Sequence, residues 1–149
     1  MFDGEIDQSG RTDVLTIDTA LALADGVKRT ILIPKSVKHR CYAQLRDRGM
    51  RKALIGIRLF SAGVVLLLED SADSLHTVTI DIEYVGWEGE IKRHVLQRLY
   101  SRGFDVGPDQ IVFRKIGKKS PAHDLAWRTF NGLHTPDKRI TLSQLCAVC

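Results

Sequence analysis

The chain has 149 residues, of which 44% are hydrophobic and 27% are charged. These proportions are typical of globular proteins and exclude a disordered chain, a collagen-like repeat and a disulfide-rich scaffold. Lysine and arginine exceed aspartate and glutamate by 22 to 18, a formal net charge of +4 that suits a polyanionic partner without requiring one. The length predicts a single domain over residues 1–149.

The start of the chain and its three cysteines bear on location. Residues 1–5 have neither the basic nor the apolar part of a secretory signal, and an odd number of cysteines does not suit a disulfide framework. We therefore expect a reducing, cytoplasmic setting. The longest apolar stretch, 53–68, is interrupted by Arg58 and is shorter than the roughly 20 residues that cross a membrane. We expect it to be buried core, with no membrane partner.

The first part of the chain predicts three short strands. Residues 2–7 alternate in character and end at a Gln-Ser-Gly turn, and residues 14–24 are rich in Val, Leu, Ile and Thr. Asp25-Gly26 then turns the chain into a third strand at 30–33. Strands joined by such short turns form an antiparallel meander.

A helix and an ambiguous segment follow. Ser36 has the side chain of a helix cap, and Gly49 would end the helix that it begins. Residues 51–70 are apolar almost throughout, which suits either a buried helix or a hairpin turning at 61–63. The length of the segment favours the helix.

The second half predicts strands that alternate with helices. Residues 77–84 alternate strictly as a strand, 88–102 form an amphipathic helix, and 111–116 form a further strand. A helix opens at Ser120-Pro121 and runs to about Phe130, because proline is favoured in a first helical turn. Residues from 136 onward are either a short helix or a loose tail.

The order of these elements predicts the fold class. Three antiparallel strands are extended by parallel strands that are joined through helices. We therefore expect an α/β fold with a mixed five-stranded sheet and helices on both of its faces.

Four carboxylates stand near the ends of predicted elements: Asp7, Asp81, Glu83 and Asp124. The first and fourth strands would be neighbours in this sheet, so these side chains are expected to converge. Clustered carboxylates repel one another, and an all-oxygen cluster favours Mg²⁺ or Mn²⁺. Two such ions about 4 Å apart activate a water and stabilise the leaving oxygen of a phosphodiester. The pattern predicts nuclease chemistry.

Three short segments carry a family resemblance: IDQSGRT at 6–12, IDIEY at 80–84 and AHDLA at 122–126. With the order of elements, they resemble the ribonuclease H-like superfamily over residues 2–130, with bacterial Holliday-junction resolvases as the nearest members. The resemblance implies a five-stranded ribonuclease H-like sheet and two Mg²⁺ or Mn²⁺ ions. It also implies a catalytic site, whose metal ligands would be Asp7, Asp81 or Glu83, and Asp124.

Two details depart from these families. Resolvases tend to carry two acids in the last helix, whereas this chain has His123 before the single Asp124. His123 would serve as a metal ligand, as a proton shuttle, or only as a capping or partly buried residue. Residues 114–122 resemble the strand-to-helix junction of type 2 ribonucleases H, but the aspartate of that junction falls on Gly117, which argues against that subfamily.

Basic residues form two groups that suit a phosphate backbone. Residues 28–52 contain nine lysines and arginines against one acid, Asp47, and a second group lies just before Asp124. An ordinary solvated face is the alternative for such a run. The expected nucleic-acid contacts are Lys35, Lys38, Arg40, Arg114, Lys115, Lys118 and Lys119.

Two hypotheses of function follow. The first is a metal-dependent endonuclease that hydrolyses phosphodiester bonds in DNA or RNA, for which junction cutting would favour a two-fold homodimer. The alternative is a non-catalytic nucleic-acid-binding or scaffold protein on the same fold. The first strand and its Ser-Gly turn also resemble the actin and sugar-kinase group, whose second half is missing here. Cys146 and Cys149 have the spacing of half a zinc site, but the other half would have to come from Cys41, His134 or a second chain, so zinc is disfavoured.

Overall fold

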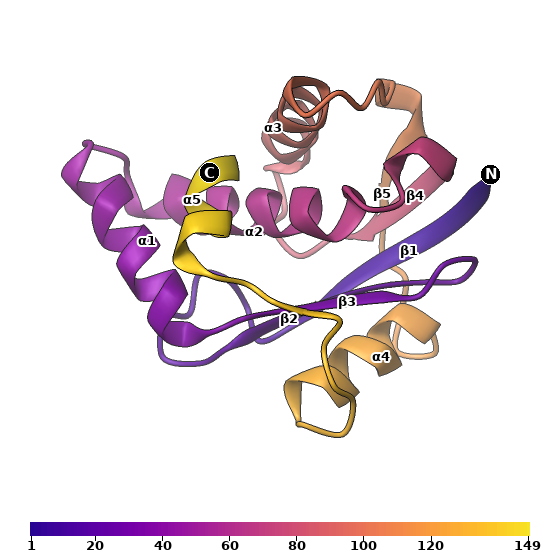
Figure 1. Ribbon diagram of the computed structural model, residues 1–149, viewed down its shortest axis with the longest axis horizontal. Coiled ribbons are helices and arrows are strands. Elements are labelled where there is room, and N and C mark those ends of the chain that lie inside the picture. Colours follow the sequence, from indigo (N-terminus) through magenta and orange to yellow (C-terminus); the bar gives the residue numbers. More distant parts are fainter.

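Six strands form one mixed sheet in the computed structural model, which describes all 149 residues (Figure 1). The strands are β1 (Phe2–Ser9), β2 (Thr19–Ala24), β3 (Arg29–Ile33), β4 (Leu75–Asp81), β5 (Ile111–Arg114) and β6 (Lys138–Arg139). The helices are α1 (Lys35–Asp47), α2 (Lys52–Leu68), α3 (Glu88–Ser101), α4 (Pro121–Phe130) and α5 (Leu142–Val148), with short 3-10 turns η1 (Ala72–Ser74) and η2 (Pro108–Gln110). None of the helices is long and apolar enough to cross a bilayer.

The strand order is β5-β4-β1-β2-β3-β6. β1, β2 and β3 pair antiparallel in sequence, and β4 and β5 extend the sheet in parallel on the other side of β1. The predicted α/β class and this mixed pairing are therefore confirmed. The sixth strand, β6, was not predicted, because its two residues pair with β3 and carry no alternation of their own.

Helices cover both faces of the sheet (Figure 1). α4 packs on β1 and β2 from one side, and α2 packs on β2 and β3 from the other. Every residue of β2 is buried as a result. α1, α3 and α5 contact α2 rather than lying directly on the sheet, so that the larger part of the core is on the α2 side.

The ambiguous segment 51–70 is a helix, as its length indicated. All residues of α2 from Ile55 onward are buried except Arg58. Gly63 allows the close approach of this helix to the sheet, because a Cβ at that position would lie 2.4 Å from Leu21 Cδ1. The continuous apolar composition is therefore that of a helix enclosed on all sides.

Residues 10–18 form a loop, where the sequence predicted the start of the second strand. Lys38 is completely buried beneath this loop and holds it. Its Nζ donates to the carbonyl oxygens of Arg11 (3.1 Å) and Val14 (2.6 Å) and to Thr19 Oγ1 (3.0 Å). Burial lowers the pKa of Lys38 to about 8. The prediction that Lys38 contacts nucleic acid is therefore wrong.

The start of α1 and the end of β4 also differ from the sequence-based prediction, and the structure decides the open question of the C-terminal segment. Pro34, and not Ser36, precedes the first residue of α1. β4 ends at Asp81, because the chain turns away through Tyr84 and Gly86, where Gly86 has a positive φ of 89°. The C-terminal segment is a helix and not a tail, since Thr141 and Gln144 cap α5 reciprocally.

The buried lysine gives a test of this account of the fold. We expect Lys38→Ala to lower the free energy of unfolding by about 3 kcal/mol, because two carbonyls and a hydroxyl lose a charged donor. Lys35→Ala, one turn earlier on an exposed position of α1, should change it by less than about 0.5 kcal/mol. Urea unfolding measures both, and equal effects would show that Lys38 does not hold the loop.

Candidate active site

The pairing of β1 with β4 brings two of the predicted acids together. Ile6 and Ile80 are partners in the parallel register, and Asp7 and Asp81 follow them at the same edge of the sheet. Glu83 lies two residues beyond the end of β4. One oxygen atom from each of the three carboxylates lies within 4.8 Å of the other two. We call Asp7, Asp81 and Glu83 the acid cluster. The convergence expected from the sequence is therefore present for Asp7, Asp81 and Glu83.

Asp7 is the buried member of the acid cluster, with a side chain only 3% exposed. Its Oδ1 accepts from the backbone N–H of Gln8 at 2.8 Å, and its Oδ2 lies 2.8 Å from His123 Nδ1. His123 reaches Asp7 because α4 lies close to the sheet through two fully buried alanines, Ala122 and Ala126. Helix α4 thus contributes a histidine to the site.

Asp124 does not join the acid cluster, contrary to what the resemblance implied. Its side chain is 62% exposed and accepts from Arg128 Nε at 2.9 Å, one turn along α4. Adjacent residues on a helix point about 100° apart, so only one of His123 and Asp124 can face the sheet. The helix presents His123 there, and Asp124 forms an i,i+4 ion pair on the outer surface.

Asp81 positions the loop that borders the site. Its Oδ1 accepts from the backbone N–H of Ile116 at 2.9 Å, just after β5 ends. This bond holds the following loop beside the acid cluster, so that Lys115 and Lys118 line the same cleft. The cleft has a volume of about 290 Å³, and Gln8, Ile82, Gly117 and His123 complete its lining.

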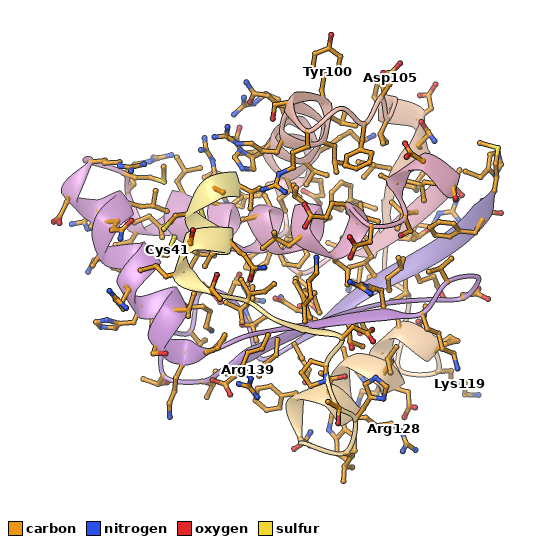
Figure 2. All side chains as sticks on the ribbon, viewed as in Figure 1. Cys41, Tyr100, Asp105, Lys119, Arg128 and Arg139 are labelled. Atoms are coloured by element: carbon orange, nitrogen blue, oxygen red, sulfur yellow. The ribbon has the colours of Figure 1, made fainter.

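The predicted basic contacts fall into three groups. Lys115 and Lys118 line the cleft, whereas Lys38 is completely buried. The others are exposed but do not line it: Lys35, Arg40, Arg114 and Lys119. Figure 2 shows Lys119 projecting outward on the side of the molecule that carries α4.

Two carboxyl groups of the acid cluster have raised pKa values. Burial raises the pKa of Glu83 to about 8, with further contributions from Asp81 and Asp7. Burial also raises the pKa of Asp7, and its hydrogen bonds to His123 and Gln8 oppose that rise. Arg11 has its Nη1 3.8 Å from Glu83 Oε2. Glu83 is therefore mostly protonated at neutral pH.

A hydrogen-bonded chain beside the cluster was not predicted. Gln8 Nε2 donates to Tyr84 Oη (3.3 Å), Tyr84 Oη lies 2.6 Å from Thr12 Oγ1, and Thr12 Oγ1 donates to the Gly56 carbonyl (3.0 Å). Each hydroxyl has one proton, so Tyr84 donates to Thr12 and accepts from Gln8. Gln8 Oε1 is buried without a partner. Gln8, Thr12 and Tyr84 lie in the segments 6–12 and 80–84, but nothing in their pattern indicated that they meet.

Comparisons of the chain with protein-family models, with curated proteins and with solved structures find no match. The functional argument therefore depends on the acid cluster, on His123 and on the surroundings of the cleft.

The raised pKa of Glu83 predicts that replacing this residue increases the stability of the protein. Between pH 4.5 and about 8 the unfolded chain has an ionised Glu83, whereas the folded protein keeps this residue protonated. The unfolded state then binds fewer protons, so this group lowers stability as pH rises through that window. Glu83→Gln removes the effect. In metal-free buffer we expect it to be more stable than wild type at pH 8, by on the order of 1 kcal/mol or more.

Urea unfolding between pH 5 and 8 in the presence of a chelator measures this difference. It should shrink towards pH 5, and Asp105→Asn, at an exposed carboxylate in the loop before β5 (Figure 2), should show no such trend. A Glu83→Gln protein that is less stable than wild type at pH 8 would contradict our account of the acid cluster.

Proposed function

We propose that this chain is a metal-dependent nuclease of the ribonuclease H-like superfamily, which hydrolyses phosphodiester bonds in DNA or RNA. Bacterial Holliday-junction resolvases are the nearest members by resemblance. The observation that carries the proposal is the acid cluster at the adjacent ends of β1 and β4, with His123 bonded to Asp7.

The sheet supports the superfamily assignment. The resemblance depends on three antiparallel strands followed by parallel strands on the other side of the first, and β5-β4-β1-β2-β3 has this order. In such a sheet β1 is central and its Asp7 has neighbours on both sides. Ligands of open α/β sheets bind beyond the carboxyl ends of parallel strands, which is where the acid cluster lies.

The residues of the acid cluster fit a hard divalent cation. They offer only carboxylate oxygens, the ligands that Mg²⁺ and Mn²⁺ prefer. Burial, with repulsion from the neighbouring acids, raises the pKa values of Asp7 and Glu83, and a bound cation would offset both effects. Asp7, Asp81 and Glu83 would hold it. One or two bound ions would activate a water and stabilise the leaving oxygen of the phosphodiester.

The protein's own residues bind the substrate and move protons. Lys115 and Lys118 line the cleft and would hold phosphates that flank the cleaved bond. While Asp7 is ionised it accepts from Nδ1 of His123, so the neutral ring carries its proton there and leaves Nε2 as a base. The ring is 38% exposed and therefore accessible to water. His123 would take up or deliver a proton at Nε2, and Asp7 would orient it.

The acid cluster also weighs against the alternative of a non-catalytic nucleic-acid-binding or scaffold protein. Ionised carboxylates beside a phosphate backbone repel it, and burying carboxyl groups costs stability. A surface that only binds nucleic acid gains nothing from this arrangement. A cation site accounts for it, because the bound ion reverses the local charge.

Metal binding is the first test, and Glu83 sets its pH dependence. A cation must displace the proton that Glu83 retains below about pH 8. We expect the affinity for Mn²⁺ to rise by up to about tenfold per pH unit from pH 6 to 8 and then to level off. Isothermal titration calorimetry measures it. Asp81→Asn should abolish binding, whereas Asp105→Asn should bind as wild type does; equal binding by both variants would place the ion elsewhere.

Cleavage is the second test. A labelled panel comprises a four-way junction, an RNA/DNA hybrid, and single and double strands, each with Mg²⁺ or Mn²⁺. We expect wild type to cut at least one member, and Asp81→Asn to bind that member but cut it at least about 100-fold more slowly. Asp124→Asn is the matched control, because Asp124 lies outside the acid cluster, and its activity should stay within about twofold.

Two results would count against the proposal in different ways. If no member is cut while all proteins bind nucleic acid, the protein is a binding module. If Asp124→Asn is as inactive as Asp81→Asn, then the site includes Asp124 and its ion pair with Arg128 breaks when substrate binds.

A further inference from the structure

Two more hollows continue from the cleft along the first turns of α2. Their volumes are about 410 and 350 Å³, and both are lined by Asp13, Lys52, Ala53 and Gly56. The larger also shares Glu83 with the cleft, so the three form one path that starts at the acid cluster. We call the two hollows the α2 groove. Its walls are the loop 10–18, the start of α2 and the segment 83–87.

The lining of the α2 groove differs from that of the cleft. Half of the residues around each hollow are apolar, whereas the cleft has only Ile82. Tyr84, Val85 and Trp87 line the larger hollow. Val85 is 79% exposed, so the hollow is open to solvent beside this residue. Tyr42 and Leu15 line the smaller one. A nucleobase has flat apolar faces and polar edges, and it suits such a lining.

Positive charge surrounds the same groove. α2 begins at Lys52, directly after Arg51; its first turn contains no acid, and no side chain caps it. Two cations at a helix N-terminus oppose the helix dipole, which normally favours acids there. A phosphate group beside Lys52 would compensate both the lysine and the uncapped helix end. Arg11 adds a third cation, and its guanidinium lies 4.5 Å above the ring of Tyr84.

The loop 10–18 packs tightly against the start of α2. A Cβ at position 56 would lie 2.8 Å from Asp13 Cβ, so only glycine lets the loop close against α2 here. Arg11 holds Asp13 by two hydrogen bonds of 3.0 and 3.2 Å. The chain from Gln8 through Tyr84 and Thr12 to Gly56 fixes the groove to the strand that carries Asp7. The groove is therefore a preformed part of the site.

On the basis of the proposed function, we propose that the α2 groove binds an unpaired nucleotide adjacent to the phosphodiester at the acid cluster. Its base lies against Val85 and Trp87, and its phosphate lies beside Lys52. A base in a duplex is paired at its edge and stacked on both faces, so it enters such a groove only after unstacking. The preferred substrate is therefore a single strand, or a structure with unpaired nucleotides at the cut.

Binding of short oligonucleotides tests this without cleavage. The probe is a fluorescein-labelled single strand, as DNA and as RNA, compared with the same sequence as a blunt duplex, in buffer with a chelator. Ala53→Leu fills the groove from an exposed position in the first turn of α2. Ala43→Leu makes the same change at an exposed position of α1 that does not line the groove. Fluorescence anisotropy gives the dissociation constants.

We expect wild type to bind the single strand about tenfold more tightly than the duplex, since one stacked base accounts for such a factor. Ala53→Leu should lose about that factor for the single strand alone, and Ala43→Leu should stay within about twofold of wild type. Lys52→Met should weaken binding and reduce its salt dependence by about one ion. Circular dichroism establishes that each variant is folded.

If Ala53→Leu and Lys52→Met leave single-strand binding unchanged, the α2 groove does not bind a nucleotide. Equal binding of duplex and single strand would contradict the proposal in the same way. This outcome is separate from the fate of the nuclease proposal. A protein that cuts a duplex and ignores Ala53→Leu is a nuclease without this groove. A protein that cuts nothing, but whose single-strand binding depends on Ala53 and Lys52, has the groove without the activity.

Discussion

The parallel pairing of β1 with β4 holds carboxylates together that would otherwise separate. Ile6, Val78 and Ile80 are completely buried and fix the register of these two strands. A slip of one residue would turn Asp7 or Asp81 to the opposite face of the sheet and expose the apolar partners instead. Hydrophobic burial thus offsets the repulsion within the acid cluster. The stability of the core and the geometry of the site depend on the same register.

Local sequence patterns were sufficient to predict those segments whose structure depends mainly on their own residues. Strict alternation predicted the fourth strand, and periodicity with terminal glycine predicted α3. The convergence of Asp7, Asp81 and Glu83 also followed from the sequence, because strand order and strand ends determine which side chains meet. Lys38 was the opposite case. Nothing in a run of exposed basic residues distinguishes the one lysine whose position in α1 faces loop carbonyls 24 and 27 residues earlier.

The exchange of Asp124 for His123 shows where motif resemblance stops being sufficient. Both residues lie in the first turn of α4, and which of them faces β1 depends on how the helix rotates against the sheet. That rotation is set by Ala122 and Ala126, whose small side chains lie fully buried against the sheet. The same two residues therefore decide whether the helix contributes a carboxylate or an imidazole to the site. A short motif identifies the residues of the helix, but it does not determine which of them faces the sheet.

Arg11 and Tyr84 connect the acid cluster with the α2 groove. Arg11 contacts Glu83 on one side, bonds Asp13 on the other, and covers the ring of Tyr84. Tyr84 in turn orients Gln8, the residue after Asp7. A group that enters the groove and displaces the guanidinium from Glu83 would leave that acid with less positive charge, so the cluster would hold a cation more strongly. Occupancy of the groove and of the cation site should therefore favour one another, because both compete with the same arginine.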